Sequence, residues 1–264
     1  MTDPPLEHDE YDLIEEELND ALAVSLSPRS HAVLFDVIAG LPLDVGATVV
    51  DVGCGEGSQS LELATRFGFD VLGIDPLEAR MRNARTAAAS TDGRIRFERG
   101  TAEAIPMEDA HADLVLCREL LYVVDDLVTV LRECHRVLRP GGFVVVYQLF
   151  STELLEPREA AWFWGGEESA RRNTPEFFES AAAEADLVIA DMIDLGSETV
   201  EAAEEASGKA GRELLAAARL RRDPERYIAR FGRAAYDIKL NDAFWFIYRM
   251  IGKLTQRVYV LSRQ

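Results

Sequence analysis

The chain has 264 residues, of which 47 are acidic and 28 are basic, and its formal net charge at pH 7 is −19. This length suits one large domain, or one domain with a cap, and leaves little room for a second catalytic domain. A surface of this charge repels polyanions, so neither nucleic acids nor anionic membranes are expected as partners.

The N-terminal sequence and the cysteines predict a soluble protein of the cytoplasm. The first 12 residues are acidic and have neither the basic start nor the apolar stretch of a signal peptide, and no apolar run approaches the ~20 residues that cross a bilayer. Cys54, Cys117 and Cys134 form no CxxC pair. They suggest neither a disulfide framework nor a metal site.

Residues 1–46 are predicted to form an N-terminal helical cap. Residues 1–10 have the composition of a disordered segment, residues 11–26 carry leucines at helical spacing, and a second helix is expected over 30–39, ending at Gly40. Both helices precede the first strand and could cover a bound ligand.

Residues 47–75 have the layout of a strand, a tight turn, a helix and a second strand. The β-branched run at 47–52 predicts a buried strand of a parallel sheet, and apolar side chains at helical spacing predict a helix over 58–67. The second strand spans 71–74. The first amides of a helix that follows such a turn can bind a ligand.

The turn is suited to a nucleoside cofactor. Gly53, Gly55 and Gly57 lack the Cβ atoms that would hold a ligand off the backbone or forbid a positive φ. Asp75 closes the second strand. In a right-handed βαβ unit the ends of adjacent parallel strands lie side by side, so the Asp75 carboxylate is placed to accept hydrogen bonds from both hydroxyls of a ribose.

The following segments continue the alternation of strands and helices. The sequence predicts a helix over 76–90, strands over 95–98 and 113–117, a helix over 126–138 and, after a Pro-Gly-Gly turn, a strand over 143–149. Five strands that alternate with helices predict a doubly wound parallel sheet.

The last third of the chain predicts a helical insertion between two strands. A helix is expected over 174–185, a sixth strand over 186–195 and a last strand over 257–261. Between these strands, one long helix is expected over 197–222, and a further helical stretch over 223–252 with a break near Asn241 and Asp242. An insertion of roughly 55 residues is longer than the loops of compact domains, so we interpret it as a lid.

The motifs resemble those of class I S-adenosylmethionine (SAM) dependent methyltransferases. Dinucleotide-binding folds use GxGxxG, whereas here the third glycine comes one residue earlier and Asp51 stands two residues before Gly53. The resulting DxGxGxG is similar to the first motif of that family without a mismatch. The segments RGTAEAIPM at 99–107, ADLVLCRELLYVVDD at 112–126 and LRECHRVLRPGGFVVV at 131–146 resemble its later blocks. The overall likeness is to the type 11 small-molecule enzymes of bacterial secondary metabolism.

The resemblance implies a fold and a division of the chain. It implies an α/β, Rossmann-like, doubly wound sheet of seven strands, mostly parallel with an antiparallel last strand. The cap then covers 1–46, the SAM-binding core 47–196, the lid 197–252 and the final strand of the sheet 253–264.

SAM is the implied cofactor. Its expected contacts come from the cap and from the ends of the strands: Tyr11, Asp51, Gly53, Cys54, Gly55, Asp75, Pro76, Leu77, Thr101, Ala102, Glu103, Cys117 and Arg118. Thr101 stands where an Asp commonly accepts the adenine amino group, which favours the Ala102 amide as the adenine contact. Cys117 and Arg118 are expected beside the methionine part. Tyr11 either folds over the cofactor or begins an amphipathic helix.

A general base is required only when the acceptor is protonated at neutral pH. The candidates are Glu119 and Tyr122, after the fourth strand, and His31 in the cap. The family often has a histidine one residue after Tyr122, where this chain has Val123. Simple orientation of the acceptor therefore remains an alternative, and Glu119 could instead be a structural hydrogen-bond acceptor.

The expected acceptor is a small, largely apolar or aromatic molecule, methylated on oxygen or nitrogen. This follows from the many aromatic residues in and near the lid: Trp162, Phe163, Trp164, Phe177, Phe178, Tyr236, Phe244 and Trp245. A homodimer is left open. Two alternatives keep the same fold: an enzyme that uses SAM in a non-methylating reaction such as a cyclisation, and a SAM-binding regulatory protein without turnover.

Overall fold

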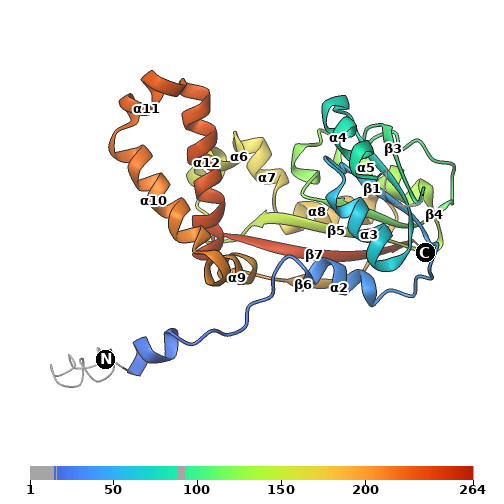
Figure 1. Cartoon of the computed structure of the whole chain (residues 1–264), viewed down its shortest axis with the longest axis horizontal. Coiled ribbons are helices and arrows are strands. Elements are labelled where there is room, and N and C mark those ends of the chain that lie inside the picture. Colours follow the sequence, from blue (N-terminus) through green and yellow to red (C-terminus); the bar gives the residue numbers. More distant parts are fainter. Residues whose placement is uncertain (1–14, 16, 89–92, 264) are drawn as a thin grey trace.

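The computed structural model describes residues 15, 17–88 and 93–263. A seven-stranded sheet with the strand order β3-β2-β1-β4-β5-β7-β6 forms its centre (Figure 1). The first five strands run parallel: β1 (Thr48–Val52), β2 (Asp70–Asp75), β3 (Ile95–Arg99), β4 (Ala112–Arg118) and β5 (Leu138–Ser151). β7 (Leu254–Arg263) lies antiparallel between β5 and β6 (Leu187–Asp194). The predicted Rossmann-like sheet with an antiparallel last strand is confirmed.

Helices bury both faces of this sheet. On one face, α5 (Leu127–Val137) and α8 (Pro175–Glu184) share a buried apolar cluster with the strands. On the other, α2 (Val33–Ala39), α3 (Ser58–Phe67) and α4 (Glu78–Ala88) share a second cluster. Adjacent residues of β1, Val49 and Val50, belong to different clusters. Because both faces are covered, the parallel strands are apolar at nearly every position.

The element boundaries follow local sequence signals. α3 has the predicted bounds, the Asp126 carboxylate accepts the Thr129 N–H to cap α5, and the Thr174 hydroxyl accepts the Phe177 N–H to cap α8. β5 begins earlier than predicted because Leu138 pairs with Ala112 of β4, and it ends later because Phe150 and Ser151 pair with β7. Three helices were not predicted from the sequence: α6 (Pro157–Trp164), α7 (Glu167–Arg172) and the short 3₁₀ helix η1 (Leu121–Val123).

The insertion between β6 and β7 contains four helices: α9 (Glu198–Ser207), α10 (Lys209–Arg222), α11 (Pro224–Phe231) and α12 (Arg233–Met250). The single helix predicted over 197–222 was wrong, because Gly208 adopts φ 61° and ends α9. The break predicted near Asn241 and Asp242 was also wrong. α12 continues through both residues, and the Asn241 side chain donates a hydrogen bond to the Phe163 carbonyl of α6.

The insertion stands at one end of the sheet. Figure 1 shows α10, α11 and α12 projecting from the end of the long strands β5 and β7. A third apolar cluster joins α6, α10 and α12 to Leu149 of β5. Within it, the ring of Tyr248 lies 4.9 Å from that of Phe244 and 5.7 Å from that of Phe163, measured between centroids. A shared apolar core therefore fixes the insertion to the sheet.

The N-terminal segment contacts the insertion through polar side chains. Ser25 donates to Glu205, and Arg29 donates to Glu198, so both bind α9. Residues 17–22 are helical, but Leu18, Leu22 and Leu26 are exposed, and this helix extends away from the sheet (Figure 1). Tyr11 lies outside the described residues. A cap over the cofactor stays a prediction.

No helix among the described residues combines the length and the apolar character required to cross a bilayer.

Candidate functional site

The glycine turn lies between β1 and α3, at the carboxyl ends of the parallel strands. All three glycines have positive φ, but they have different surroundings. A Cβ on Gly57 would meet the ring of Phe97 at 2.5 Å, and one on Gly53 would meet Leu120 at 2.9 Å, whereas one on Gly55 would meet nothing within 4 Å. Gly57 is therefore required for packing, and Gly55 is the glycine that leaves open space for a ligand.

Asp75 ties this turn to the end of β2. Its Oδ2 accepts the Gly55 N–H at 3.1 Å and its Oδ1 accepts the Leu77 N–H at 2.8 Å. The carboxylate is 3% exposed, and Arg80 Nη1 lies 3.8 Å from Oδ2. Each carboxylate oxygen can accept a second hydrogen bond, so both keep capacity for ribose hydroxyls. The residues present fit the nucleoside part of SAM.

The side chains of Asp51 and Cys54 pack in the core next to the turn. The buried Asp51 carboxylate accepts the Ser60 hydroxyl at 2.6 Å and so links β1 to α3, and burial raises the pKa of Asp51 to about 6. The Cys54 thiol faces Met81 in the core, where burial raises its pKa. The thiol also lies 3.9 Å from the Gly55 carbonyl oxygen, so the buried Cys54 side chain packs against the turn.

The residues predicted to hold the adenine gather beside Asp75. Gly100 N–H donates to the Asp75 carbonyl, which brings the segment after β3 to the end of β2. Leu77 is 51% exposed, Thr101 and Glu103 are exposed, and the Ala102 side chain is buried in the core. The Ala102 backbone amide as the adenine contact stays a prediction.

The end of β4 holds Cys117, Arg118 and Glu119. The fully buried Cys117 thiol faces Cys134 of α5, so only its backbone remains for the predicted cofactor contact. The Arg118 guanidinium lies 5.6 Å from the centre of the Tyr147 ring. Glu119 has φ 50°, and its N–H donates to the Tyr147 carbonyl at 2.8 Å. A left-handed conformation at a non-glycine residue is often found at functional sites.

Glu119 belongs to a group of side chains that we call the polar cluster. Its members are His31, Glu119, Tyr147, Thr199, Arg249 and Gln256. His31 Nδ1 and the Tyr147 hydroxyl are 2.5 Å apart. Arg249, near the end of α12, donates to the Thr199 hydroxyl at the start of α9. The N-terminal segment, the sheet and the insertion thus meet at one place.

The electrostatics of the polar cluster keep His31 and Tyr147 uncharged at neutral pH. Burial, aided by the charges of Arg249 and Arg118, lowers the pKa of His31 to about 4. Burial raises the pKa of Tyr147 to about 12. Burial also raises the pKa of Glu119, while the charges of the two arginines oppose this rise. At neutral pH the imidazole can therefore accept a proton or a hydrogen bond, and the phenol keeps its proton.

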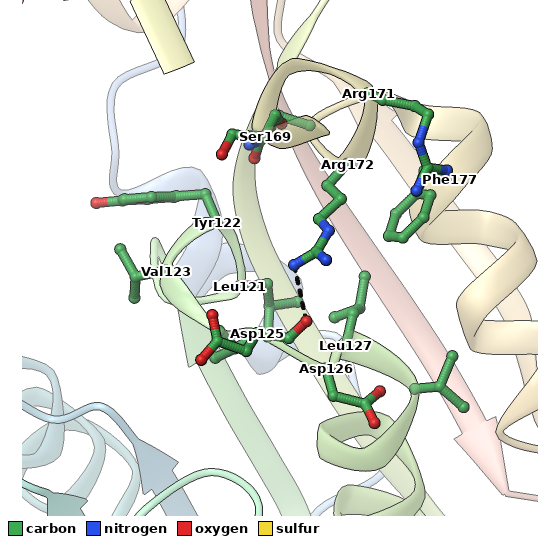
Figure 2. Close-up of a pocket in the computed structure, with 13 residues that line it drawn as sticks. Leu121, Tyr122, Val123, Asp125, Asp126, Leu127, Ser169, Arg171, Arg172 and Phe177 are labelled. Atoms are coloured by element: carbon green, nitrogen blue, oxygen red, sulfur yellow. Dashed lines mark hydrogen bonds between the residues drawn. The ribbon is translucent and has the colours of Figure 1, made fainter. Parts of the chain in front are cut away.

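A pocket of about 410 Å³ lies between η1, the start of α5, α7 and α8 (Figure 2). Arg172 reaches from α7 to the Asp125 carbonyl at 2.8 Å. Tyr122 lines the pocket, and its ring lies 5.9 Å from that of Trp245 and 6.2 Å from that of Trp164. Burial and the charge of Glu119 raise the pKa of Tyr122. Glu119 is thus a neighbour of both the pocket and the polar cluster.

The structure brings together the three candidate bases, although their roles stay predictions. The sequence analysis missed Tyr147, Thr199, Arg249 and Gln256 of the polar cluster. A usable signal existed for Gln256, because it is a polar residue at the start of the last strand. Thr199 and Arg249 carry no local signal.

Comparisons with known proteins agree with this geometry. Residues 50–146 match the family model described as a methyltransferase domain. The 27-O-demethylrifamycin SV methyltransferase of Amycolatopsis mediterranei is 39% identical over 112 residues, which cover 41% of each chain. A ubiquinone biosynthesis O-methyltransferase of Pseudomonas paraeruginosa is 41% identical over 110 residues, covering 41% of this chain and 46% of the relative. The chain thus spans less than half the length of these relatives.

The fold is also shared over a greater length. The crystal structure of the cyclase SpnF superposes with a TM-score of 0.69 at 20% sequence identity, and covers 97% of this chain and 94% of that one. At this identity the likeness shows the fold alone. It extends to the insertion as well as the sheet.

We predict that His31 titrates far below an ordinary histidine. A proton NMR titration should give a His31 pKa of about 4, and Arg249→Met should raise it because a neighbouring positive charge is removed. The unfolded chain binds this proton near pH 6.5, so His31 should contribute a loss of stability as the pH falls from 6.5 to 4. The spectrum of His31→Gln identifies the resonance. A titration midpoint of His31 near pH 6.5 in the unmodified protein would contradict a neutral, buried His31.

Proposed function

Residues 50–146 form a class I SAM-dependent methyltransferase domain, and from this premise we propose that the chain transfers the methyl group of SAM to an oxygen or nitrogen atom of a small molecule. The observation that carries the proposal is the position of Gly55 and Asp75 at the same edge of the sheet as Glu119. Doubly wound folds bind their ligands at this edge.

In this proposal the residues of the chain bind SAM and orient the acceptor. Asp75 is proposed to bind the ribose, and the open space beside Gly55 to admit the cofactor backbone. When bound, SAM supplies an already activated methyl group, so holding the acceptor in line can contribute ~7 to 11 kcal/mol of the rate enhancement. Arg118, at the end of β4, has a charge suited to the cofactor carboxylate.

Glu119 is the proposed proton acceptor for hydroxyl or ammonium acceptors. It belongs to the polar cluster and is a neighbour of Tyr122 in the pocket, and burial raises its pKa, which makes the carboxylate a stronger base. Tyr122 keeps its proton because its pKa is also raised, so it is suited to donate a hydrogen bond. His31 is the alternative base, and its low pKa makes it the weaker one.

The acceptor is proposed to have an apolar or aromatic body. Tyr122, Trp164 and Trp245 form a group of rings beside the pocket. In the proposal, the insertion of residues 197–252 acts as the lid that selects the acceptor. A cytoplasmic location is part of the same proposal.

The direct test of the function is transfer of label. The purified chain is incubated with methyl-labelled SAM and a panel of small aromatic alcohols, phenols and amines, and the products are separated from SAM and counted. We expect label in at least one acceptor. Bound SAM without transfer across a broad panel would contradict methylation and favour a non-methylating reaction of the same fold.

Replacing Glu119 tests its role as the base. Glu119→Gln should lower kcat for a hydroxyl acceptor by about 10²- to 10⁴-fold and leave SAM affinity within about twofold, because the amide keeps the shape and loses the basic oxygen. Glu153→Gln, a change in the loop after β5, serves as the matched control. An unchanged kcat in Glu119→Gln would show that orientation alone is sufficient.

A further inference from the structure

Among the residues that the structure describes, Arg249 is a buried cation that forms no ion pair with a carboxylate. It is 5% exposed, one of its terminal nitrogens donates to Thr199, and its Nε has no hydrogen-bond partner within the described ranges. Glu119 acts on it through charge, but no ion pair joins them. An unpaired buried guanidinium is unfavourable, because the site withholds the water that would otherwise solvate it.

The composition of the chain makes this arrangement unusual. The chain has 47 acidic residues for 28 basic ones, so carboxylates are abundant. Other arginines use them: Arg136 pairs with Asp109 and Glu133, and Arg257 pairs with Asp194 and Glu179. The missing counter-charge at Arg249 therefore points to a ligand that supplies it.

Gln256 provides a second, independent observation. It is fully buried, and neither polar atom of its amide has a close hydrogen-bond partner among the residues that the structure describes, although the amide lies near the Glu119 carboxylate and lowers the pKa of Glu119. Its β7 position pairs with Leu149, two residues from Tyr147 on β5, so Gln256 and Tyr147 lie diagonally on the same face of the sheet. Buried polar side chains in proteins are nearly always hydrogen-bonded. Arg249 and Gln256 are two such exceptions, and both lie near Glu119, which indicates a binding site.

The polar cluster adjoins the proposed active site. His31 is partly exposed while its Nδ1 contacts Tyr147, so the cluster is open on the side of the N-terminal segment. Glu119 is close to both sides, because its charge acts on Tyr122 of the pocket and on Arg249 of the cluster. A molecule bound beside Glu119 can therefore place one of its groups against Arg249.

We propose that Arg249, together with Gln256, binds a carboxylate of the methyl acceptor. The Arg249 Nε–H donates to one carboxylate oxygen, the Gln256 amide N–H donates as well, and the buried charge gains its counter-ion. The inference rests on the proposed function and narrows its substrate class to acceptors that carry a carboxylate on an apolar or aromatic body. Arg249 is thus a specificity-determining residue.

The test compares two small probes of similar shape, benzoate and neutral benzamide. Their binding to the full chain is measured by titration calorimetry, with and without saturating S-adenosylhomocysteine. We expect benzoate to bind about 10- to 100-fold more tightly than benzamide, because a hydrogen bond to a charged group is worth about that factor. Equal binding of the two probes, or no measurable binding of benzoate, would overturn the proposal.

Substitutions locate the preference. Arg249→Met should abolish it, and Arg249→Lys should weaken it, because lysine keeps the charge and lacks the Nε–H. Gln256→Leu should reduce benzoate binding and leave benzamide binding less affected, which keeps the test valid if Arg249→Met does not fold. Arg230→Met, at an exposed arginine of α11, is the matched control and should change nothing. A preference for benzoate that survives in both Arg249 variants would refute the assignment.

The two proposals fail in different ways. If S-adenosylhomocysteine binds, label is transferred to acceptors and the preference for benzoate is absent, the carboxylate site is wrong and the methyltransferase function stands. If S-adenosylhomocysteine does not bind, the methyltransferase function is wrong, whatever the probes do.

Discussion

The antiparallel pairing of β7 between β5 and β6 is the constraint on which the rest of the structure depends. Nine residues of β5, Phe143 to Ser151, pair with nine of β7. The chain leaves the sheet at the end of β6 and returns as β7, which is antiparallel to β6. The insertion of residues 197–252 therefore starts and finishes at the same end of these two strands. This pairing places Gln256 near Tyr147. It also brings Arg249, at the end of α12, close to Tyr147, which His31 of the N-terminal segment contacts.

The parallel half of the sheet supplies the other component of the site. The short strands β1, β2 and β4 end beside each other, and Asp75 joins two of these ends through hydrogen bonds to Gly55 and Leu77. Because this carboxylate is largely buried, backbone N–H groups rather than water molecules solvate its charge. The proposed cofactor half of the site is thus built from local turns, and the proposed acceptor half from contacts between distant segments.

This division explains how much could be predicted from the sequence. The glycine turn, Asp75 and the alternation of strands and helices follow from short-range patterns, and the structure has them at the predicted positions. Arg249 and Thr199 form a pair only because the insertion folds back on the sheet, which no local pattern encodes. The break expected at Asn241 and Asp242 failed because burial of the adjacent Ala243 and Phe244 outweighs weak helix propensity.

The central claim is that Asp75 holds the ribose of SAM at this edge. It is tested most directly by the affinity of Asp75→Ala for S-adenosylhomocysteine, measured by calorimetry. The control is Asp70→Ala, at the exposed start of the same strand, and circular dichroism confirms that both variants fold. The account predicts a loss of at least about tenfold in Asp75→Ala and none in Asp70→Ala. Unchanged affinity in a folded Asp75→Ala would contradict it.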